Sequence, residues 1–355
     1  MSVEVSYNKQ FLLGLIFIII ILIVIEIGIK TYEFIFPSCE FIDADVFAEV
    51  DFGIKRSICL DSIYLSTTST PITLYPPNQN FETITINSHG FRGQDFSSIK
   101  NDDVFRIFIV GGSTTFGFGS ASDNTTIPGF LQNQFDKSGH NVEVINAGIG
   151  AAWSFSEEYL IENYLLDYKP DLIIIYDGAN DSRYRILEDE QKNSVGIGEF
   201  IPNFYRTPYF LNDFIFKVGF AEEKLNPKLN TERVNSVSSL WNQRMQNICN
   251  IGNENDFDVA IILQPMLTTE NRELYGDETI FHKKHVDLHG ENAIMVYEIM
   301  KESIETLENC SLTHDMTQIF QDSDKAVYWD DVHIIEEGNK VVADELSIIL
   351  ESLID

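Results

Sequence analysis

Residues 105–119 carry the feature that most constrains the fold, an apolar run that ends abruptly in glycines. The run contains β-branched residues and stops at Gly111 and Gly112, which Ser113 follows. Such a run is typical of a central parallel strand that opens into a loop at its carboxyl end. Ligands bind at that end in open α/β sheets. Ser113 is therefore either the N-cap of a helix or an exposed functional hydroxyl, and this segment alone favours neither.

Two other interpretations of the same segment fail on single residues. Gly112 and Gly117 have the spacing of a phosphate-binding loop, but Phe118 stands where that loop needs lysine to neutralise the phosphates. The nucleophile elbow G-x-S-x-G also fails, because Thr115 replaces its second glycine.

Further apolar runs alternate with amphipathic stretches along the chain. Ser154 and Glu157 have the spacing of a capping box and are expected to begin one of the helices. Strands that alternate with helices predict βαβ units and a parallel sheet. The expected strands are residues 105–110, 141–145, 172–176 and 259–263, with a weaker one at 310–313, and amphipathic helices are expected at 127–135, 234–248 and 294–307 and near the C-terminus.

Residues 11–29 form an apolar block that only Glu26 interrupts with a charge. As a helix, a block of this length spans a hydrocarbon core of about 30 Å. No small-residue cleavage site of the A-x-A kind follows, so we expect an uncleaved transmembrane anchor rather than a removed signal peptide. Lys9 and Lys30 flank the block and leave the positive-inside rule nearly balanced. The short tail before the block favours a signal-anchor, with the acidic domain outside the cytoplasm.

The charge and the cysteines limit the partners and the compartment. The net charge of -31, from 24 basic and 55 acidic residues, argues against nucleic acid and against an anionic membrane surface as partners. The four cysteines form no C-x-x-C pair, which argues against a zinc site built on them. They permit two disulfides if the domain lies outside the cytosol, and three pairings remain open. The cysteines are Cys39, Cys59, Cys249 and Cys310.

Three histidines are spaced so that they share roughly one face of a helix, namely His282, His285 and His289. This spacing suits a metal site, but no carboxylate or cysteine pattern completes it, and Lys283 and Lys284 are adjacent. We therefore expect a solvated polar face and no metal.

The rest of the chain divides by composition. We expect a tail at residues 1–10, the anchor at 11–29, a juxtamembrane segment of short strands and loops at 30–99, and a catalytic domain at 100–355. Within that domain, residues 183–231 lack clean periodicity and are rich in aromatic side chains. They are expected to form an insertion, which serves either as a lid or acyl-binding surface or as packing on the domain.

Polar and small residues follow three of the expected strands. Ser113, Gly148 and Asn180 each stand in the loop at the carboxyl end of a different strand, so a parallel sheet brings them to one crevice. Asp330 and His333, just before the last helix, have the spacing of an oriented general base, although an acidic turn explains them equally well. Together these residues supply the nucleophile, base, orienter and oxyanion donors that acyl transfer by serine requires.

The sequence resembles the SGNH/GDSL hydrolases, including their membrane-anchored members. The resemblance covers about residues 85–355 and rests on motifs in the family's order. It departs from the family at Gly112, where the motif has aspartate, a residue outside the triad. The matching motifs are N-S-x-G-F-R at residues 87–92, G-G-S at 111–113, Gly148, G-x-N-D at 178–181, D-x-x-H at 330–333 and E-E-G-N at 336–339.

The resemblance implies a flavodoxin-like three-layer α/β/α fold and ester hydrolysis without a cofactor. It implies Ser113 as nucleophile, His333 as base and Asp330 as its orienter, with an oxyanion hole formed by Ser113, Gly148 and Asn180. The expected function is a membrane-anchored esterase for acetyl or short-chain esters, including those on carbohydrate. One alternative is an O-acyltransferase acting on cell-surface glycans, and another is a non-catalytic surface module with the same fold.

Overall fold

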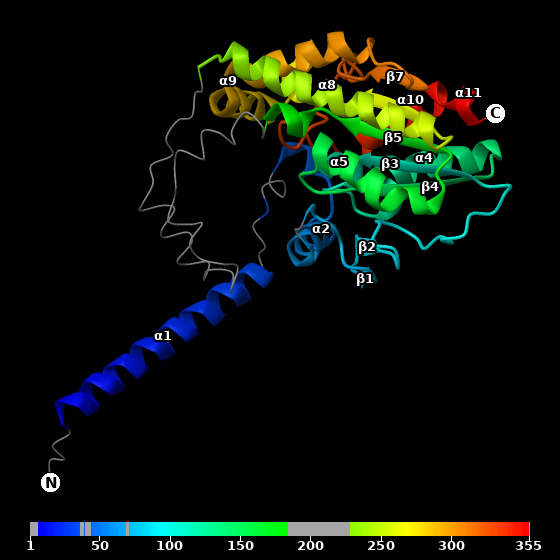
Figure 1. Cartoon of the computed structure of the whole chain (residues 1–355). Coiled ribbons are helices and arrows are strands. Elements are labelled where there is room, and N and C mark those ends of the chain that lie inside the picture. Colours follow the sequence, from blue (N-terminus) through cyan, green and yellow to red (C-terminus); the bar gives the residue numbers. More distant parts are fainter. Residues whose placement is uncertain (1–5, 36–38, 40–43, 69–70, 184–227, 355) are drawn as a thin grey trace. The chain divides into compact units, whose positions relative to one another are not determined.

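The computed structural model describes residues 6–35, 39, 44–68, 71–183 and 228–354 (Figure 1). The described residues from Cys39 onward belong to one compact unit, and the N-terminal helix belongs to another. The insertion expected at residues 183–231 lies, except for its two ends, outside the described residues.

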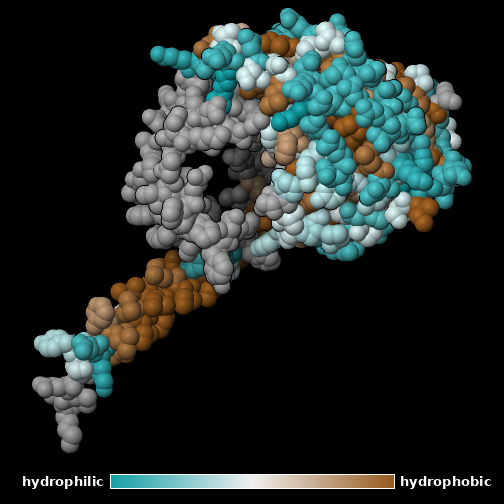
Figure 2. Space-filling view, in the orientation of Figure 1, coloured by the Kyte–Doolittle hydropathy of each residue, from teal (hydrophilic) through white to brown (hydrophobic). Residues whose placement is uncertain are grey.

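Helix α1 (Tyr7–Ile35) contains the predicted anchor and extends beyond it at both ends. Its residues Tyr7–Tyr32 have a mean hydropathy of 3.2 over the most apolar window, and that window is not buried. Figure 2 shows an apolar surface along this helix. By length and composition α1 is able to cross a membrane, a property that signal sequences share.

The compact unit is organised around a five-stranded sheet in the order β4-β3-β5-β6-β7. Every neighbouring pair in this sheet is parallel. The strand predicted to be central, β3, lies between β4 and β5, which confirms that prediction. The strands are β3 (Phe105–Gly111), β4 (Val142–Gly148), β5 (Leu172–Asp177), β6 (Asp258–Leu263) and β7 (Leu312–Asp315).

Helices cover both faces of the sheet, because successive side chains of a strand point to opposite faces. Ile107 and Ile109 pack with α4 (Ile127–Ser138) and α10 (Glu336–Ile349). The alternate residues, Phe108 and Val110, belong to a cluster with α5, α8 and α9. The result is the predicted three-layer α/β/α arrangement. The helices of the second layer are α5 (Ser154–Leu160), α8 (Thr231–Glu254) and α9 (Glu278–Ile304), and α9 kinks at Gly290.

The segment that precedes the sheet contains a helix that the sequence analysis did not anticipate. Helix α2 (Phe52–Tyr64) follows Asp51, whose carboxylate accepts hydrogen bonds from the first backbone N–H groups of the helix. Its residues Ile58 and Cys59 are buried in a cluster that includes Trp329. Capping and tertiary burial therefore outweigh a weak local helix signal. The same segment contains the short antiparallel pair β1 (Gln79–Asn80) and β2 (Thr85–Ile86).

The disulfides join Cys39 to Cys59 and Cys249 to Cys310, which selects one of the three possible pairings. No free cysteine remains. The shorter helical turns of the described residues are η1 (Asp45–Phe47), α3 (Ser113–Phe116), η2 (Asp123–Thr125), η3 (Ile161–Leu165), η4 (Leu166–Tyr168), η6 (Leu267–Thr269) and α11 (Glu351–Ile354).

The capping box predicted at the start of α5 is not formed. Ser154 begins the helix, but its hydroxyl donates to Asp181 Oδ1 at 2.6 Å. Glu157 is buried beside Asp177 and Asp181, and neither of its carboxylate oxygens has a hydrogen-bond partner among the described residues. Burial, reinforced by these two neighbouring carboxylates, raises the pKa of Glu157 well above its ordinary value.

Candidate active site

The end of β3 positions Ser113. A side chain at Gly111 would place its Cβ only 2.4 Å from the Tyr176 carbonyl oxygen, so the strand exit requires glycine there. Gly112 is extended, and Ser113 then begins the short helix α3, which ends at Gly117 with a φ of 90°. The sharp change from strand to helix leaves the Ser113 side chain partly exposed beyond the sheet.

Ser113, His333 and Asp330 form a continuous chain of hydrogen bonds. His333 Nε2 lies 2.6 Å from Ser113 Oγ, and His333 Nδ1 lies 2.6 Å from Asp330 Oδ2. With Asp330 ionised, Nδ1 carries the proton that it donates to the carboxylate. Nε2 then accepts the Ser113 hydroxyl hydrogen, which is the arrangement needed to remove that proton.

The loop that carries His333 is fixed by its own hydrogen bonds. Asp330 Oδ1 accepts from the backbone N–H groups of Val332 at 2.8 Å and His333 at 2.6 Å. The Trp329 ring stacks on the His333 imidazole with ring centroids 4.6 Å apart and planes 12° from parallel. These contacts therefore fix the orientation of the Asp330 carboxylate and of the His333 imidazole before a substrate binds.

The E-E-G-N motif ties α10 to the chain that follows α3. Glu336 Oε1 accepts from the Ala121 N–H and from Thr125 Oγ1, each at 2.8 Å. Asn339 Nδ2 donates to Ser120 Oγ at 3.1 Å and to the Thr125 carbonyl at 3.0 Å. These contacts connect the helix after His333 to the segment after Ser113.

Arg92, in the N-S-x-G-F-R motif, has a structural role. Its guanidinium is buried and donates to the carbonyl oxygens of Phe116 at 3.0 Å and Gly117 at 2.9 Å. Its Nε forms an ion pair with Asp123 at 2.7 Å. Arg92 therefore satisfies the carbonyl groups at the end of the helix that Ser113 begins.

Asn180 follows β5, and its side chain is nearly buried beside the nucleophile. Its Nδ2 donates to the Ala152 carbonyl oxygen at 2.5 Å. A Cβ at Gly112 would meet the same nitrogen at 2.7 Å, so the amide lies against the residue that precedes Ser113. An amide nitrogen carries two hydrogens, so this bond uses only one of them.

Gly148, the predicted oxyanion donor, has its N–H hydrogen-bonded within the protein. The Gly148 N–H donates to Asn146 Oδ1 at 3.0 Å. A Cβ at Gly148 would lie 2.2 Å from the backbone nitrogen of Phe116, so glycine is needed there for the close packing of α3 on β4. Gly148 therefore supports the nucleophile helix, and its amide is already used.

Ala151 lies in the same loop, and the sequence analysis did not single it out as a candidate site residue. The N–H groups of Ile149, Gly150 and Ala152 donate to Gly111 O, the Tyr75 hydroxyl and Ile149 O. The Ala151 N–H has no hydrogen-bond partner among the described residues. Ala151 also has a φ of 58°, a left-handed conformation that is uncommon for alanine. No residue type in the loop signals this backbone geometry.

The adjacent aspartates face different histidines. Asp331 Oδ2 lies 2.6 Å from His285 Nδ1, whereas Asp330 faces His333. The prediction of a solvated face at His282, His285 and His289 is wrong for the last two. Their side chains, on α9, are buried, with 2% of the surface exposed. Burial, with the nearby charges of His285 and Arg183, lowers the pKa of His289 to about 3.

Comparison with family models finds similarity to the GDSL-like lipase/acylhydrolase family over residues 107–346. Among similar solved structures is an acetyl xylan esterase, AlAXEase, at 14% identity and a TM-score of 0.42, with 69% of this chain and 100% of the other covered. A lipase/acylhydrolase from Enterococcus faecalis matches at 12% identity and a TM-score of 0.42, with 70% and 96% covered. Comparison with curated proteins finds no match.

The family match spans more than half of the 355 residues and includes Ser113, Asn180 and His333. The parallel sheet and its flanking helices are the architecture expected for such a protein. The chain therefore belongs to the GDSL-like lipase/acylhydrolase family, and it is a serine hydrolase that acts on ester bonds.

Proposed function

We propose that the chain is a membrane-anchored esterase that removes acetyl or short acyl groups, with Ser113 as nucleophile, His333 as base and Asp330 as orienter. The observation that carries this proposal is the hydrogen-bond chain from Ser113 Oγ through His333 to Asp330, with 2.6 Å at each link. Ser113 meets His333, which stands 220 positions later, and the nearby Asp330, and together they supply the atoms that acyl transfer requires.

In the first half of the reaction, Ser113 Oγ attacks the ester carbonyl carbon while His333 Nε2 takes the hydroxyl proton. The Asp330 carboxylate accepts from Nδ1–H and stabilises the imidazolium that forms. Collapse of the tetrahedral intermediate expels the alcohol, which receives the proton from Nε2. An acyl-Ser113 ester remains. In the second half, water takes the place of the alcohol, and the same proton transfers release the acid.

The negative charge on the carbonyl oxygen needs donors that are already in place. We assign this role to the Ser113 N–H, to the second hydrogen of Asn180 Nδ2 and to the Ala151 N–H. Asn180 donates to the carbonyl of Ala152, the next residue after Ala151, so its amide is fixed beside that loop. Ala151 replaces Gly148 in this set because only its N–H lacks a partner among the described residues of the loop.

The net charge favours a neutral substrate. With a charge of -31, the protein repels anionic lipids and acidic polysaccharides, and this repulsion lowers their concentration near the site. Acetyl esters of neutral sugars avoid this cost. The O-acyltransferase alternative uses the same acyl-Ser113 intermediate, with a sugar hydroxyl in place of water in the second half.

We place the domain outside the cytoplasm, anchored by α1. The apolar helix Tyr7–Tyr32 and the two disulfides support this assignment, since disulfides persist in oxidising compartments.

The chemistry is tested on the full-length chain in detergent. It should hydrolyse p-nitrophenyl acetate and react covalently with a fluorophosphonate probe, and Ser113→Ala should abolish both. The nearby Thr114→Val is a matched control, because Thr114 donates to Gln264 at 3.0 Å and has no part in the proposed reaction. Probe labelling that persists in Ser113→Ala would reject Ser113 as the nucleophile.

The substrate class is tested by comparing acetylated neutral sugars, acetylated uronic acids and esters of increasing chain length. We expect the neutral acetylated sugars to give the highest kcat/KM. Adding a non-acetylated sugar as acceptor then separates the two reactions. Release of free acetate that is unchanged by the acceptor supports hydrolysis, and transfer of acetyl to the acceptor supports the acyltransferase.

A further inference from the structure

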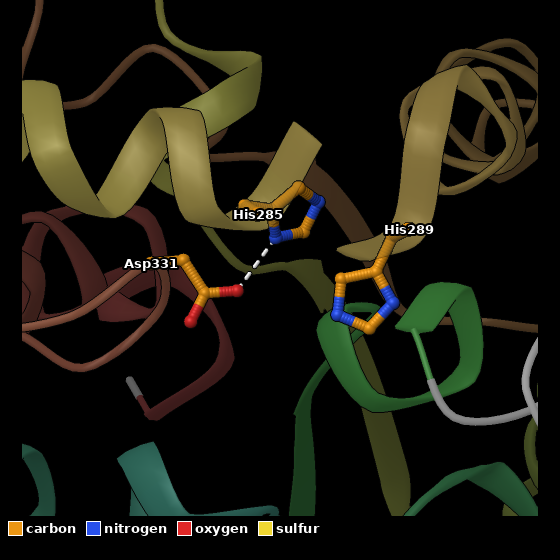
Figure 3. Close-up of side chains that lie close together, drawn as sticks. All are labelled: His285, His289 and Asp331. Carbon is orange, nitrogen blue, oxygen red and sulfur yellow. Dashed lines mark hydrogen bonds and ion pairs between the residues drawn. The ribbon is translucent and has the colours of Figure 1, made fainter. Parts of the chain in front are cut away.

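Two histidines and an aspartate converge beside the proposed catalytic loop (Figure 3). His285 and His289 lie on α9, and Asp331 comes from the loop that also carries Asp330 and His333. One potential ligand atom from each of the three lies within 4.8 Å of the other two. The proposed esterase mechanism uses none of these side chains.

The spacing of the histidines suits metal binding. Residues four apart on a helix lie on the same face, and this spacing places two imidazoles on one zinc ion in helical metal sites. The two rings are in contact, with centroids 4.7 Å apart. The bend at Gly290 comes after both histidines, so it leaves their spacing intact.

The environment of the two rings also indicates a missing ligand. Both histidines are buried, each with 2% of its surface exposed. His289 Nδ1 is buried and has no hydrogen-bond partner among the described residues. Buried polar atoms with no partner are rare in folded proteins. The hydrogen bonding of the His289 ring is therefore incomplete.

Asp331 supplies the carboxylate that sequence analysis did not find. Its described contacts, to His285 Nδ1 at 2.6 Å and Arg183 Nη1 at 3.4 Å, both involve Oδ2. Arg183 compensates part of its charge, but the carboxylate keeps its second oxygen. The Asp331 side chain is 18% exposed, which gives an ion access from solvent.

We propose that His285, His289 and Asp331 bind a zinc ion that ties α9 to the loop carrying Asp330 and His333. Two imidazoles and a carboxylate match the ligands zinc prefers, and three protein ligands leave the fourth position to water. Tetrahedral zinc bonds of about 2.0–2.2 Å hold ligand atoms roughly 3.3–3.6 Å apart. Small side-chain rotations that separate His285 Nδ1 from Asp331 Oδ2, now 2.6 Å apart, and bring the His289 nitrogen into range complete the site. The ion replaces the proton between His285 and Asp331, and binding releases that proton to the buffer.

The consequence for catalysis rests on the proposed function, whereas zinc binding does not. Asp331 is adjacent to Asp330, so a bond from Asp331 to zinc fixes the backbone that positions the orienter and, through it, His333. Zinc removal should therefore lower kcat while leaving KM nearly unchanged.

The test uses the full-length chain in detergent, stripped with EDTA and titrated calorimetrically with zinc chloride. We expect one zinc per chain and a higher thermal midpoint. His289→Asn should weaken binding by about 100-fold or more, and Asp331→Asn by about 10- to 100-fold. His140→Ala, a histidine outside the cluster, should bind as the native chain does. Circular dichroism of the metal-free variants must match that of the metal-free native chain.

If a variant does not fold, X-ray absorption of the zinc-loaded native chain decides the matter, because two imidazole ligands are expected. Three results would each overturn the proposal: failure of the native chain to bind one zinc ion per chain, an absorption spectrum that shows no imidazole ligand, and unchanged zinc affinity in a folded His289→Asn. Ser113→Ala should bind zinc as the native chain does. The zinc titration can therefore be interpreted even if the esterase test fails.

Discussion

Asn180 combines a structural contact with a proposed catalytic one. Asn180→Ala should lower kcat by about 10²–10³-fold, the usual cost of one oxyanion donor, and leave KM nearly unchanged. It should also destabilise the fold by about 1 kcal/mol, because the hydrogen bond to Ala152 O is lost. Asn180→Asp should be at least as harmful, since a carboxylate would face both that carbonyl and the developing oxyanion. Steady-state kinetics and urea unfolding measure the two effects, and near-normal turnover in Asn180→Ala would leave only the structural role.

Ala151 contributes through its backbone, so a side-chain substitution does not test it. Replacing Ala151 by lactic acid changes its N–H to an ester oxygen, keeps the methyl group, and should lower kcat by about 10²–10³-fold. Replacing Gly148 by glycolic acid removes the N–H bonded to Asn146 and should change kcat by less than about tenfold. Rapid kinetics on the two semisynthetic chains compare the donors directly. The opposite ranking would restore Gly148 to the oxyanion hole.

The loop from Tyr328 to His333 carries two neighbouring carboxylates, Asp330 and Asp331, to which we assign different roles. Asp330→Ala should lower kcat by up to about 10⁴-fold, the loss seen when the orienter of a triad histidine is altered. Asp331→Asn should cost far less, because Asp331 faces His285 and acts only through the loop. Measuring kcat for both variants in zinc-saturated buffer checks this order. Equal losses would mean that the wrong carboxylate has been assigned to His333.

Glu157 and Asp177 are buried where α5 meets the end of β5, and these carboxyl groups should make the stability of the protein depend on pH. Burial raises the pKa of Glu157 and Asp177 well above their ordinary values, so the folded state holds protons that the unfolded chain releases. The free energy of unfolding should therefore fall as the pH rises through the window between the ordinary and the raised values. Glu157→Gln removes the charge and should flatten this decline, so that the variant is more stable than the native chain above the window.

Urea unfolding of the native chain and of Glu157→Gln between about pH 4 and pH 9 measures this difference. Glu158→Gln is the matched control, since Glu158 pairs with Arg244 at 3.7 Å near the surface. Parallel profiles for all three proteins would show that Glu157 carries no buried charge.

On the scale of the whole molecule, the proposed orientation concerns which side of the membrane holds the acidic domain. Protease added to intact cells should cleave the domain and spare a cytosolic marker. A thiol-reactive probe should label no cysteine of the domain until a reductant is added, because all four are paired. Protection of the domain until the cells are lysed would place it in the cytoplasm.

The sequence predicted the parts of the molecule that local composition determines. The strand expected at residues 172–176 became β5 (Leu172–Asp177), because a strand buried on both faces reads as a continuous apolar run. The meeting of Ser113 with His333 was expected from the family resemblance and not from the strand pattern, because His333 stands in the loop just before α10.

The parts that escaped prediction depend on contacts between distant residues or on backbone angles. The partner of His285 stands 46 positions away in another loop, so helical spacing alone left the histidine pair incomplete. The choice between Gly148 and Ala151 depends on a φ of 58° and on the side chain of Asn146, neither of which a motif encodes. Helix α2 depends on burial against residues such as Trp329, far along the chain.

The two disulfides join cysteines that are consecutive in the chain, the first with the second and the third with the fourth. A chain exported as it is synthesised presents its cysteines to the oxidising side in that order. If the domain is exported in this way, as the proposed topology implies, Cys39 meets Cys59, 20 positions later, before Cys249 has emerged, and no later thiol competes for it. Cys249 and Cys310 then pair after the first two are already bonded. Correcting a non-native bridge requires thiol–disulfide exchange, a step that this order of pairing avoids during such export.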